Sequence, residues 1–112
     1  MAKVEILKDL KEEILKKFKA ESKIIFKLMC SLKENPHKGK ELGNIGSVVI
    51  KEVRHKSFRF YFITDGQKLR IMDINYLSDL LIRFVRMSDK NEQQKVINEI
   101  RIVLQKIGEG GF

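Results

Sequence analysis

The spacing of apolar residues predicts two helices near the start of the chain. After Asp9, apolar side chains recur every three or four positions with lysine and glutamate between them. They are Leu10, Ile14, Leu15 and Phe18. A second helix follows over Ile24, Ile25, Leu28, Met29 and Leu32, and it must end before Asn35-Pro36 because proline disfavours helix at the preceding residue. We interpret the pair as a helical hairpin, preceded by Val4–Leu7, which fits either a short strand or the start of the first helix.

Alternating polar and apolar positions predict strands in the middle of the chain. Val48–Arg54 and Phe58–Thr64 are expected to form a hairpin around a short turn at His55–Ser57. Side chains alternate across a strand, which puts Phe58, Phe60 and Phe62 on one face and Arg59, Tyr61 and Ile63 on the other. Asp65-Gly66 is typical of a type I′ turn, so a third antiparallel strand is predicted over Lys68–Ile74.

The remaining segments are less regular. The basic, glycine-spaced stretch His37–Gly46 is predicted to be a loop, and it lacks the Gly-Lys-Ser/Thr ending of a phosphate-binding P-loop. A short turn or helix is expected at Asn75–Asp79 and a strand through Ile82–Arg86, although the apolar spacing from Leu77 also fits a helix. Ser88-Asp89 begins a last amphipathic helix, which Gly108 ends before a flexible tail.

These elements predict a single α+β domain over residues 1–112. A short strand and helical hairpin occupy residues 1–36, an antiparallel sheet residues 47–87, and a C-terminal helix residues 89–108. No apolar run approaches the ~20 residues of a bilayer span, and the first residues lack a secretory signal, so we expect a cytoplasmic protein without membrane contact. The lone Cys30 is expected in the core, and one cysteine excludes a disulfide framework or a cysteine-based zinc site.

Charge narrows the class of partner. The formal net charge of +8 on 112 residues favours a polyanion such as nucleic acid, the ribosome or an acidic membrane surface. A solvated, lysine-rich surface explains the same charge. The lysines at positions 16, 17, 19, 23 and 27 are interpreted as such a surface.

Four segments, taken in order, resemble the RelE/ParE toxin superfamily, and most closely its HigB-type, phage-derived branch. Leu32–Pro36 with Lys40–Leu42 resembles the segment after the family's second helix, and Lys51–Arg54 (Lys-Glu-Val-Arg) resembles its Glu-Leu-Arg strand. Phe58–Phe62 (Phe-Arg-Phe-Tyr-Phe) resembles its Tyr-Arg-x-x-Tyr strand. Phe84–Lys90 (Phe-Val-Arg-Met-Ser-Asp-Lys) resembles its Phe-Val-Lys-Lys-Thr-x-Lys segment. The resemblance covers most of the chain and implies a RelE-like fold, with the hairpin packed on the sheet.

The resemblance also implies a function. Toxins of this family bind the ribosomal A site, cut mRNA there without a metal or cofactor, and are held in check by a cognate antitoxin protein. Arg54 and Arg59 match the phosphate clamp, a task that suits the planar guanidinium fork. Tyr61 would stack on a base or position the RNA, and His55 at the turn is a candidate for proton transfer. The basic residues expected to add phosphate contacts are Lys51, Arg70, Arg86 and Lys90.

Two departures from the family pattern keep alternatives open. Glu52 stands where some relatives carry lysine, and Met87 replaces a basic residue. Besides His55 and Tyr61, both Glu52 and Tyr76 are candidates for moving the proton. A non-catalytic RelE-like domain that binds RNA or protein, or a ParE-like gyrase inhibitor, therefore remains an alternative. A further alternative is that Arg54 and Arg59 pair with acidic residues and merely stabilise the sheet, which would leave no phosphate site. The acidic candidates are Glu52, Asp73 and Asp79.

Overall fold

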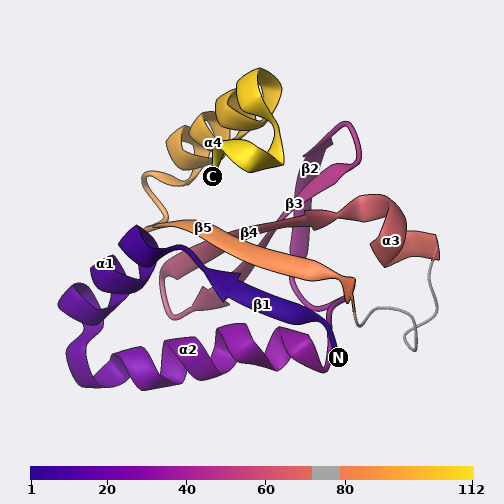
Figure 1. Ribbon diagram of the computed structural model, residues 1–112. Helices are drawn as coiled ribbons and strands as arrows, with labels where there is room; N and C mark the ends of the chain where they lie inside the picture. The colour runs from indigo at the N-terminus through magenta and orange to yellow at the C-terminus, as the bar shows by residue number, and fades with distance from the viewer. Residues whose placement is uncertain (72–78) are drawn as a thin grey trace.

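The computed structural model, which describes residues 1–71 and 79–112, is an α+β fold built on a five-stranded mixed sheet (Figure 1). Its strands are β1 (Lys3–Ile6), β2 (Lys40–Ile45), β3 (Val48–His55), β4 (Phe58–Asp65) and β5 (Leu81–Ser88). The order across the sheet is β1-β5-β4-β3-β2. Strand β1 runs parallel to β5, and the other neighbours are antiparallel. The open choice at Val4–Leu7 is thus decided in favour of a strand.

The predicted β3–β4 hairpin is confirmed, with a tighter turn than expected. His55 pairs with Phe58, which leaves Lys56 and Ser57 as a two-residue turn. Lys56 has a φ of 56°, the left-handed conformation that such turns require. The predicted strand through 82–86 is also confirmed and is extended at both ends in β5.

Both N-terminal helices form as predicted and cover one face of the sheet. Helix α1 (Lys8–Phe18) is joined by the 3₁₀ turn η1 (Lys19–Glu21) to α2 (Ser22–Cys30), which continues into η2 (Ser31–Lys33). The core on this face contains Leu10 and Ile14 of α1, Ile25 and Met29 of α2, and Phe60, Phe62 and Phe84 of the sheet. The prediction that the Phe row faces a core is therefore confirmed. Cys30 is exposed rather than buried, because it lies on the outer side of α2.

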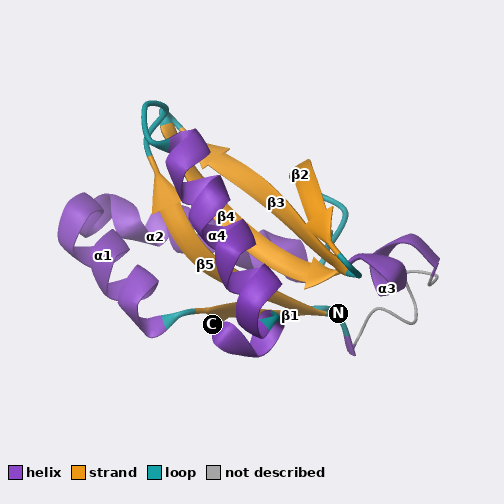
Figure 2. Ribbon diagram, turned by 90° about the horizontal axis from the view of Figure 1, so that it is seen from above, coloured by secondary structure: helices purple, strands orange, loops and turns teal. Residues whose placement is uncertain are grey.

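Helix α4 (Gln93–Ile107) lies on the opposite face of the sheet, as Figure 2 shows from above. Its apolar side packs on a second core, to which the strands contribute Ile50, Tyr61, Ile63 and Val85. The helix begins at Gln93, later than the predicted start at Ser88-Asp89, because β5 continues to Ser88. The Asp89 carboxylate accepts a hydrogen bond of 2.9 Å from the backbone N–H of Glu92 in the turn before the helix. Gly108 ends the helix with a φ of 66°.

The expectation of a flexible C-terminal tail is wrong. Residues Glu109–Gly111 form the 3₁₀ turn η4, and Phe112 packs against the core under α4. The Arg83 guanidinium donates a 3.2 Å hydrogen bond to the backbone carbonyl of Glu109. Glycine content alone suggested mobility, whereas the terminal phenylalanine supplies an apolar anchor.

The predicted strand over Lys68–Ile74 is wrong in its described part, because Gly66–Ile71 is the helix α3. The Asp65 carboxylate accepts hydrogen bonds from the backbone N–H groups of Gln67 and Lys68, at 3.0 and 3.2 Å. Asp65-Gly66 is therefore a helix start and not a hairpin turn. Residues 72–74 of that prediction, most of the segment predicted at 75–79, and Asp73 and Tyr76 lie outside the described residues.

Strand β2 was missed within the predicted loop 37–46. It pairs antiparallel with β3 from Ile45–Val48 to Lys40–Glu52, with a bulge between Glu41 and Gly43. The side chain of Arg101 lies so close to Gly43 that a Cβ atom there would collide with it. A glycine at a bulge conceals a strand from sequence patterns. None of the helices in the described ranges has the length and apolar character needed to cross a bilayer.

Candidate nucleic-acid interface

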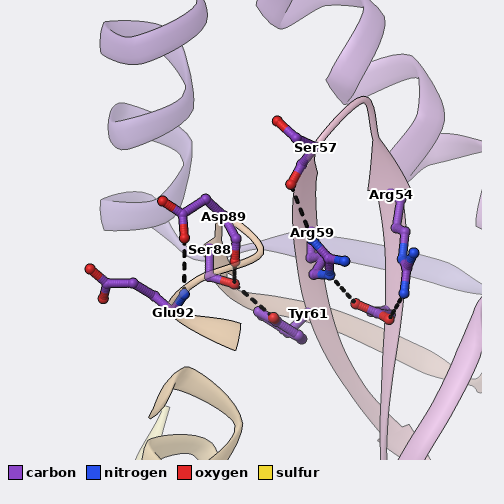
Figure 3. A network of polar contacts seen from close by, with 8 residues as sticks. Arg54, Ser57, Arg59, Tyr61, Ser88, Asp89 and Glu92 are labelled. Carbon is purple, nitrogen blue, oxygen red and sulfur yellow. Dashed lines mark hydrogen bonds and ion pairs between the residues drawn. The ribbon is translucent and has the colours of Figure 1, made fainter. Parts of the chain in front are cut away.

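Several of the predicted site residues come together where the β3–β4 hairpin and the end of β5 meet. Directly paired residues on neighbouring strands point to the same face of a sheet. Arg59 of β4 pairs with Arg54 of β3 on one side and with Ser88 of β5 on the other. Two residues further along β4, Tyr61 pairs with Arg86 of β5. We call the group Arg54, Arg59, Arg86 and Ser88 the sheet-end surface. It lies on the α4 side of the sheet, since Arg86 forms an ion pair with Glu99 of that helix. Figure 3 shows Arg54, Arg59 and Ser88 of this group, together with Glu92, the residue just before α4.

A buried carboxylate lies among the arginines of this surface. Glu52 is only 1% exposed, and its Oε1 atom lies 3.3 Å from a terminal nitrogen of Arg54. Its Oε2 atom lies 3.7 Å from Nε of Arg59, an ion pair without a hydrogen bond. Arg59 also donates a 3.1 Å hydrogen bond to the carbonyl of Ser57 (Figure 3). The alternative in which Glu52 pairs with the arginines is therefore what the structure contains.

The two arginines differ in access to solvent. The side chain of Arg54 is 50% exposed, whereas that of Arg59 is 8% exposed. Arg54 is thus free to meet a ligand directly, and Arg59 contributes charge from beneath it. A guanidinium has five N–H donors, and one contact to Glu52 leaves most of those on Arg54 available.

Arg86 and Lys90 extend the positive charge toward α4. Arg86 forms a 2.8 Å ion pair with Glu99 on that helix, and both side chains are about 40% exposed. Exposed ion pairs of this kind contribute little stability, so a phosphate can displace the glutamate at small cost. Lys90 follows the end of β5 and is exposed.

Tyr61 lies under the surface rather than on it. It has no exposed area, and its hydroxyl is within 2.7 Å of the Ser88 hydroxyl, which donates a 2.9 Å hydrogen bond to the carbonyl of Asp89. Burial raises the pKa of Tyr61, an effect that the hydrogen bond to Ser88 partly offsets. A fully buried ring cannot stack on a base in this conformation, so the expected stacking role is not compatible with its position.

His55 is turned away from the arginines. It pairs with Phe58, whose ring contacts Phe18 of α1, so both side chains belong to the face that carries α1 and α2. The Nε2 atom of His55 lies 2.8 Å from the carboxylate of Glu21, which also binds Lys56. The hydrogen bond from Lys56 and then that from His55 lower the pKa of Glu21. His55 therefore links the hairpin turn to η1 and does not join the sheet-end surface.

Two of the predicted phosphate ligands are also elsewhere. Lys51 lies on the α1–α2 face, where its ammonium donates a 3.0 Å hydrogen bond to the carbonyl of His37, and burial lowers its pKa. Arg70 is on α3, 3.5 Å from Glu41 of β2 and remote from the hairpin turn. Lys51 and Arg54 are three residues apart on β3, and side chains alternate between the two faces of a strand, so the two residues point to opposite faces of the sheet.

Two clefts flank the sheet-end surface. One of about 240 Å³ is lined by Glu13, Lys17, Phe58, Arg86, Met87, Ser88, Asp89, Glu92 and Val96, between α1 and the start of α4. The second cleft, of about 250 Å³, lies beside Arg54. Its lining consists of Arg54 together with Leu28, Lys38, Gly39, Lys40, Glu52 and Val53. Four further residues of this region were not expected from the sequence: Lys17, Lys38, Lys40 and Ser88. Cross-strand pairing and helix packing bring them there, and neither can be deduced from local sequence.

Within residues 1–71 and 79–112, no group of three or more His, Cys, Asp or Glu side chains is arranged to hold a metal ion. We also compared the chain with protein-family models, with curated proteins and with solved structures. None of the three comparisons gives a significant match.

Proposed function

We propose that this chain is an RNA-directed toxin of the RelE type, and that its sheet-end surface receives the RNA backbone. The observation that carries the proposal is the gathering of Arg54, Arg59 and Arg86 on one face at one end of the sheet. These arginines come from the motifs on which the resemblance to the RelE/ParE superfamily rests. A short strand and two helices before the β3–β4 hairpin, and a last helix after the sheet, agree with the order that the resemblance implies, whereas α3 takes the place of the expected third strand of the meander.

Phosphate binding is the step that the geometry supports best. Arg54 is half exposed with unused donors, and Arg86 forms an ion pair with the partly exposed Glu99. Arginine binds phosphate through parallel N–H···O contacts and stays charged at every physiological pH. With Lys90 close by in the chain and a net charge of +8, these groups form a basic site suited to the backbone of single-stranded RNA.

Cleavage of mRNA on the ribosome is the activity that the resemblance implies, and we propose it as the reaction. Such cleavage needs a group that takes the 2′-hydroxyl proton, cations that stabilise the phosphate, and an acid for the leaving oxygen. Arg54, Arg59 and Arg86 would supply the cations. A cytoplasmic location, the ribosome as platform and a cognate antitoxin as partner belong to the same proposal.

A non-catalytic RelE-like RNA-binding domain is the second candidate. It is favoured by the positions of Tyr61 and His55, because one is fully buried and the other faces the opposite side of the sheet. Glu52, a third candidate for proton transfer, does contact Arg54 and Arg59, but its carboxylate is buried and already paired with them. The fourth candidate, Tyr76, lies outside the described residues. Such a domain would inhibit translation by occupying RNA, without producing cut messages.

The chain offers a matched pair of variants that tests the proposal. Arg86 and Arg70 both have solvent-accessible side chains, 42% and 62% exposed, and each pairs with one glutamate, but only Arg86 belongs to the sheet-end surface. We expect Arg86→Gln to weaken binding to a short single-stranded RNA and to reduce the salt slope by about 0.7. Arg70→Gln removes the same charge and should bind RNA like the wild type.

Expression in cells then separates the candidate functions. Mapping the 5′ ends of messages should show cuts inside translated frames with wild type and Arg70→Gln, and fewer with Arg86→Gln. Translation arrest and RNA binding without new 5′ ends would establish the non-catalytic domain. Equal losses in both variants would mean that only net charge matters, and absence of RNA binding by the wild type would refute the proposal. Growth arrest with intact RNA and altered DNA supercoiling would indicate a gyrase inhibitor instead.

A further inference from the structure

The buried carboxylate of Glu52 is unusual in a surface meant for an anion. It is 1% exposed and lies between Arg54 and Arg59, two of the three arginines that the proposed function assigns to the RNA backbone. A carboxylate near a phosphate site repels the ligand and cancels part of the positive charge that attracts it. Its position therefore calls for a role other than direct contact with RNA.

The contacts of Glu52 with the arginines are loose. One oxygen makes a single 3.3 Å hydrogen bond to Arg54, and the other lies 3.7 Å from Nε of Arg59. Both Glu52 Oε2 and Arg59 Nε lack a hydrogen-bond partner in the described part of the chain. The paired, parallel N–H···O geometry that makes arginine–carboxylate contacts strong is thus absent.

Loose contacts of this kind suit a ligand that has to be exchanged. Without a nearby anion, two neighbouring guanidinium groups on paired positions would repel each other and separate. Glu52 keeps both side chains at the sheet end by offering the kind of oxygen acceptor that a phosphate also offers. A phosphate can present more than one oxygen to Arg54, and so it can replace the single bond to Glu52.

We infer that Glu52 is an internal competitor of the RNA phosphate, which positions Arg54 and Arg59 while RNA is absent and limits how tightly the surface binds it. The inference rests on the proposed function, because it assigns Glu52 a part in the same RNA contact. Glu52 is then a positioning residue that sets affinity and not a catalytic base.

The first test is Glu52→Gln, which keeps the shape of the side chain and removes its charge. We expect it to bind a short single-stranded RNA roughly tenfold more tightly than wild type, with a steeper salt dependence. The matched control is Glu41→Gln, which removes one charge from a carboxylate paired with Arg70, outside the sheet-end surface. This control should bind RNA like the wild type, and equal gains in both variants would attribute the effect to net charge and overturn the inference.

Because Glu52→Gln leaves Arg59 buried without an anion, the variant is expected to be less stable. A measurement on the wild type avoids that difficulty. NMR signals of the Glu52 carboxyl carbon and of the Arg54 and Arg59 side-chain N–H groups should shift when RNA is added. Those of the Glu41–Arg70 pair should not. Binding of RNA with unchanged Glu52 and Arg59 signals would show that the carboxylate is purely structural.

The outcomes separate the inference from the proposed function. If wild type binds RNA through Arg86 but Glu52→Gln binds no more tightly and the Glu52 signals do not move, the inference alone is refuted. If wild type does not bind RNA at all, the proposed function is refuted and the inference with it.

Discussion

Replacing Tyr61 with phenylalanine tests whether this residue supports the sheet or takes part in RNA chemistry. The substitution keeps the buried ring and removes the hydroxyl that lies 2.7 Å from Ser88 Oγ. Ser88 keeps its hydrogen bond to the carbonyl of Asp89, so only one buried hydrogen bond is lost. A net loss of about 1.5 kcal/mol of unfolding free energy follows, since removing one partner of a buried hydrogen bond costs about 1 to 3 kcal/mol.

For a domain of this size, that loss should lower Tm by about 6 °C. Urea unfolding gives the free energy directly, and RNA binding of Tyr61→Phe should equal that of the wild type, because the hydroxyl is buried. The reasoning is refuted if the variant is as stable as wild type. It is also refuted if RNA cleavage disappears while folding is intact, since Tyr61 would then act on RNA from another conformation.

The raised pKa of Tyr61 adds a dependence on alkaline pH. A folded-state pKa above the unfolded value, here 10.0, means that the folded state holds the phenolic proton more tightly. The resulting stability is fully present below that value and is lost as pH rises through the folded pKa. The advantage of wild type over Tyr61→Phe should therefore be constant near neutrality and shrink as pH rises above 10.0. The difference in unfolding free energy between the two proteins isolates the effect of Tyr61, because all other ionisable groups are the same in both.

Two further substitutions test residues on the α1–α2 face. Lys51→Met removes a charged group whose pKa burial lowers, together with its hydrogen bond to the His37 carbonyl and its cation–π contact with the Phe62 ring. Because the charge is costly to bury, stability should stay within about 1 kcal/mol of wild type, and RNA binding should not change. Weaker RNA binding would contradict the assignment of Lys51 to the other face. Glu21 has a lowered pKa, so its contribution is present above its unfolded value of 4.5 and is lost as pH falls through the folded value. Glu21→Gln should therefore be less stable than wild type near neutrality and equal to it in acid, and a difference independent of pH would exclude the ion pairs with Lys56 and His55 as its cause.

Much of the sheet and both long helical regions follow from local patterns, but the site depends on one detail of a turn. The sequence predicts a turn at His55–Ser57, whereas the hairpin turns at Lys56-Ser57 alone. A change of one residue in a turn changes which side chains face each other across the strands. The pairing of Arg54 with Arg59, and of Glu52 with Tyr61, could not be fixed without it. The sequence offered Glu52 as only one of three acidic residues that could pair with the arginines, and the structure shows that Glu52 contacts both.

Long-range pairing explains the other differences. Asp65-Gly66 fits a hairpin turn and a helix start equally well over two residues, and the backbone N–H groups that Asp65 binds decide between them. Strand β2 carries a glycine bulge and only partly buried apolar residues, so its alternation is weak and its pairing with β3 creates it. Ser88 was expected to begin the last helix, whereas it ends β5 and lies opposite Arg59, a pairing that local sequence does not reveal.

The parallel pairing of β1 with β5 has a consequence for how the molecule reaches its folded state. Lys3 lies beside Leu81 and Ile6 beside Phe84, so the chain must close a loop that spans more than two thirds of its length to make these contacts. Contacts between residues distant in sequence slow folding, because loop closure costs entropy before any contact forms. The β3–β4 hairpin, whose strands are joined by two residues, should form early, and β5 should dock late. Arg86 would then join the two arginines of the hairpin only near the end of folding, and a chain still emerging during synthesis would lack a complete basic surface.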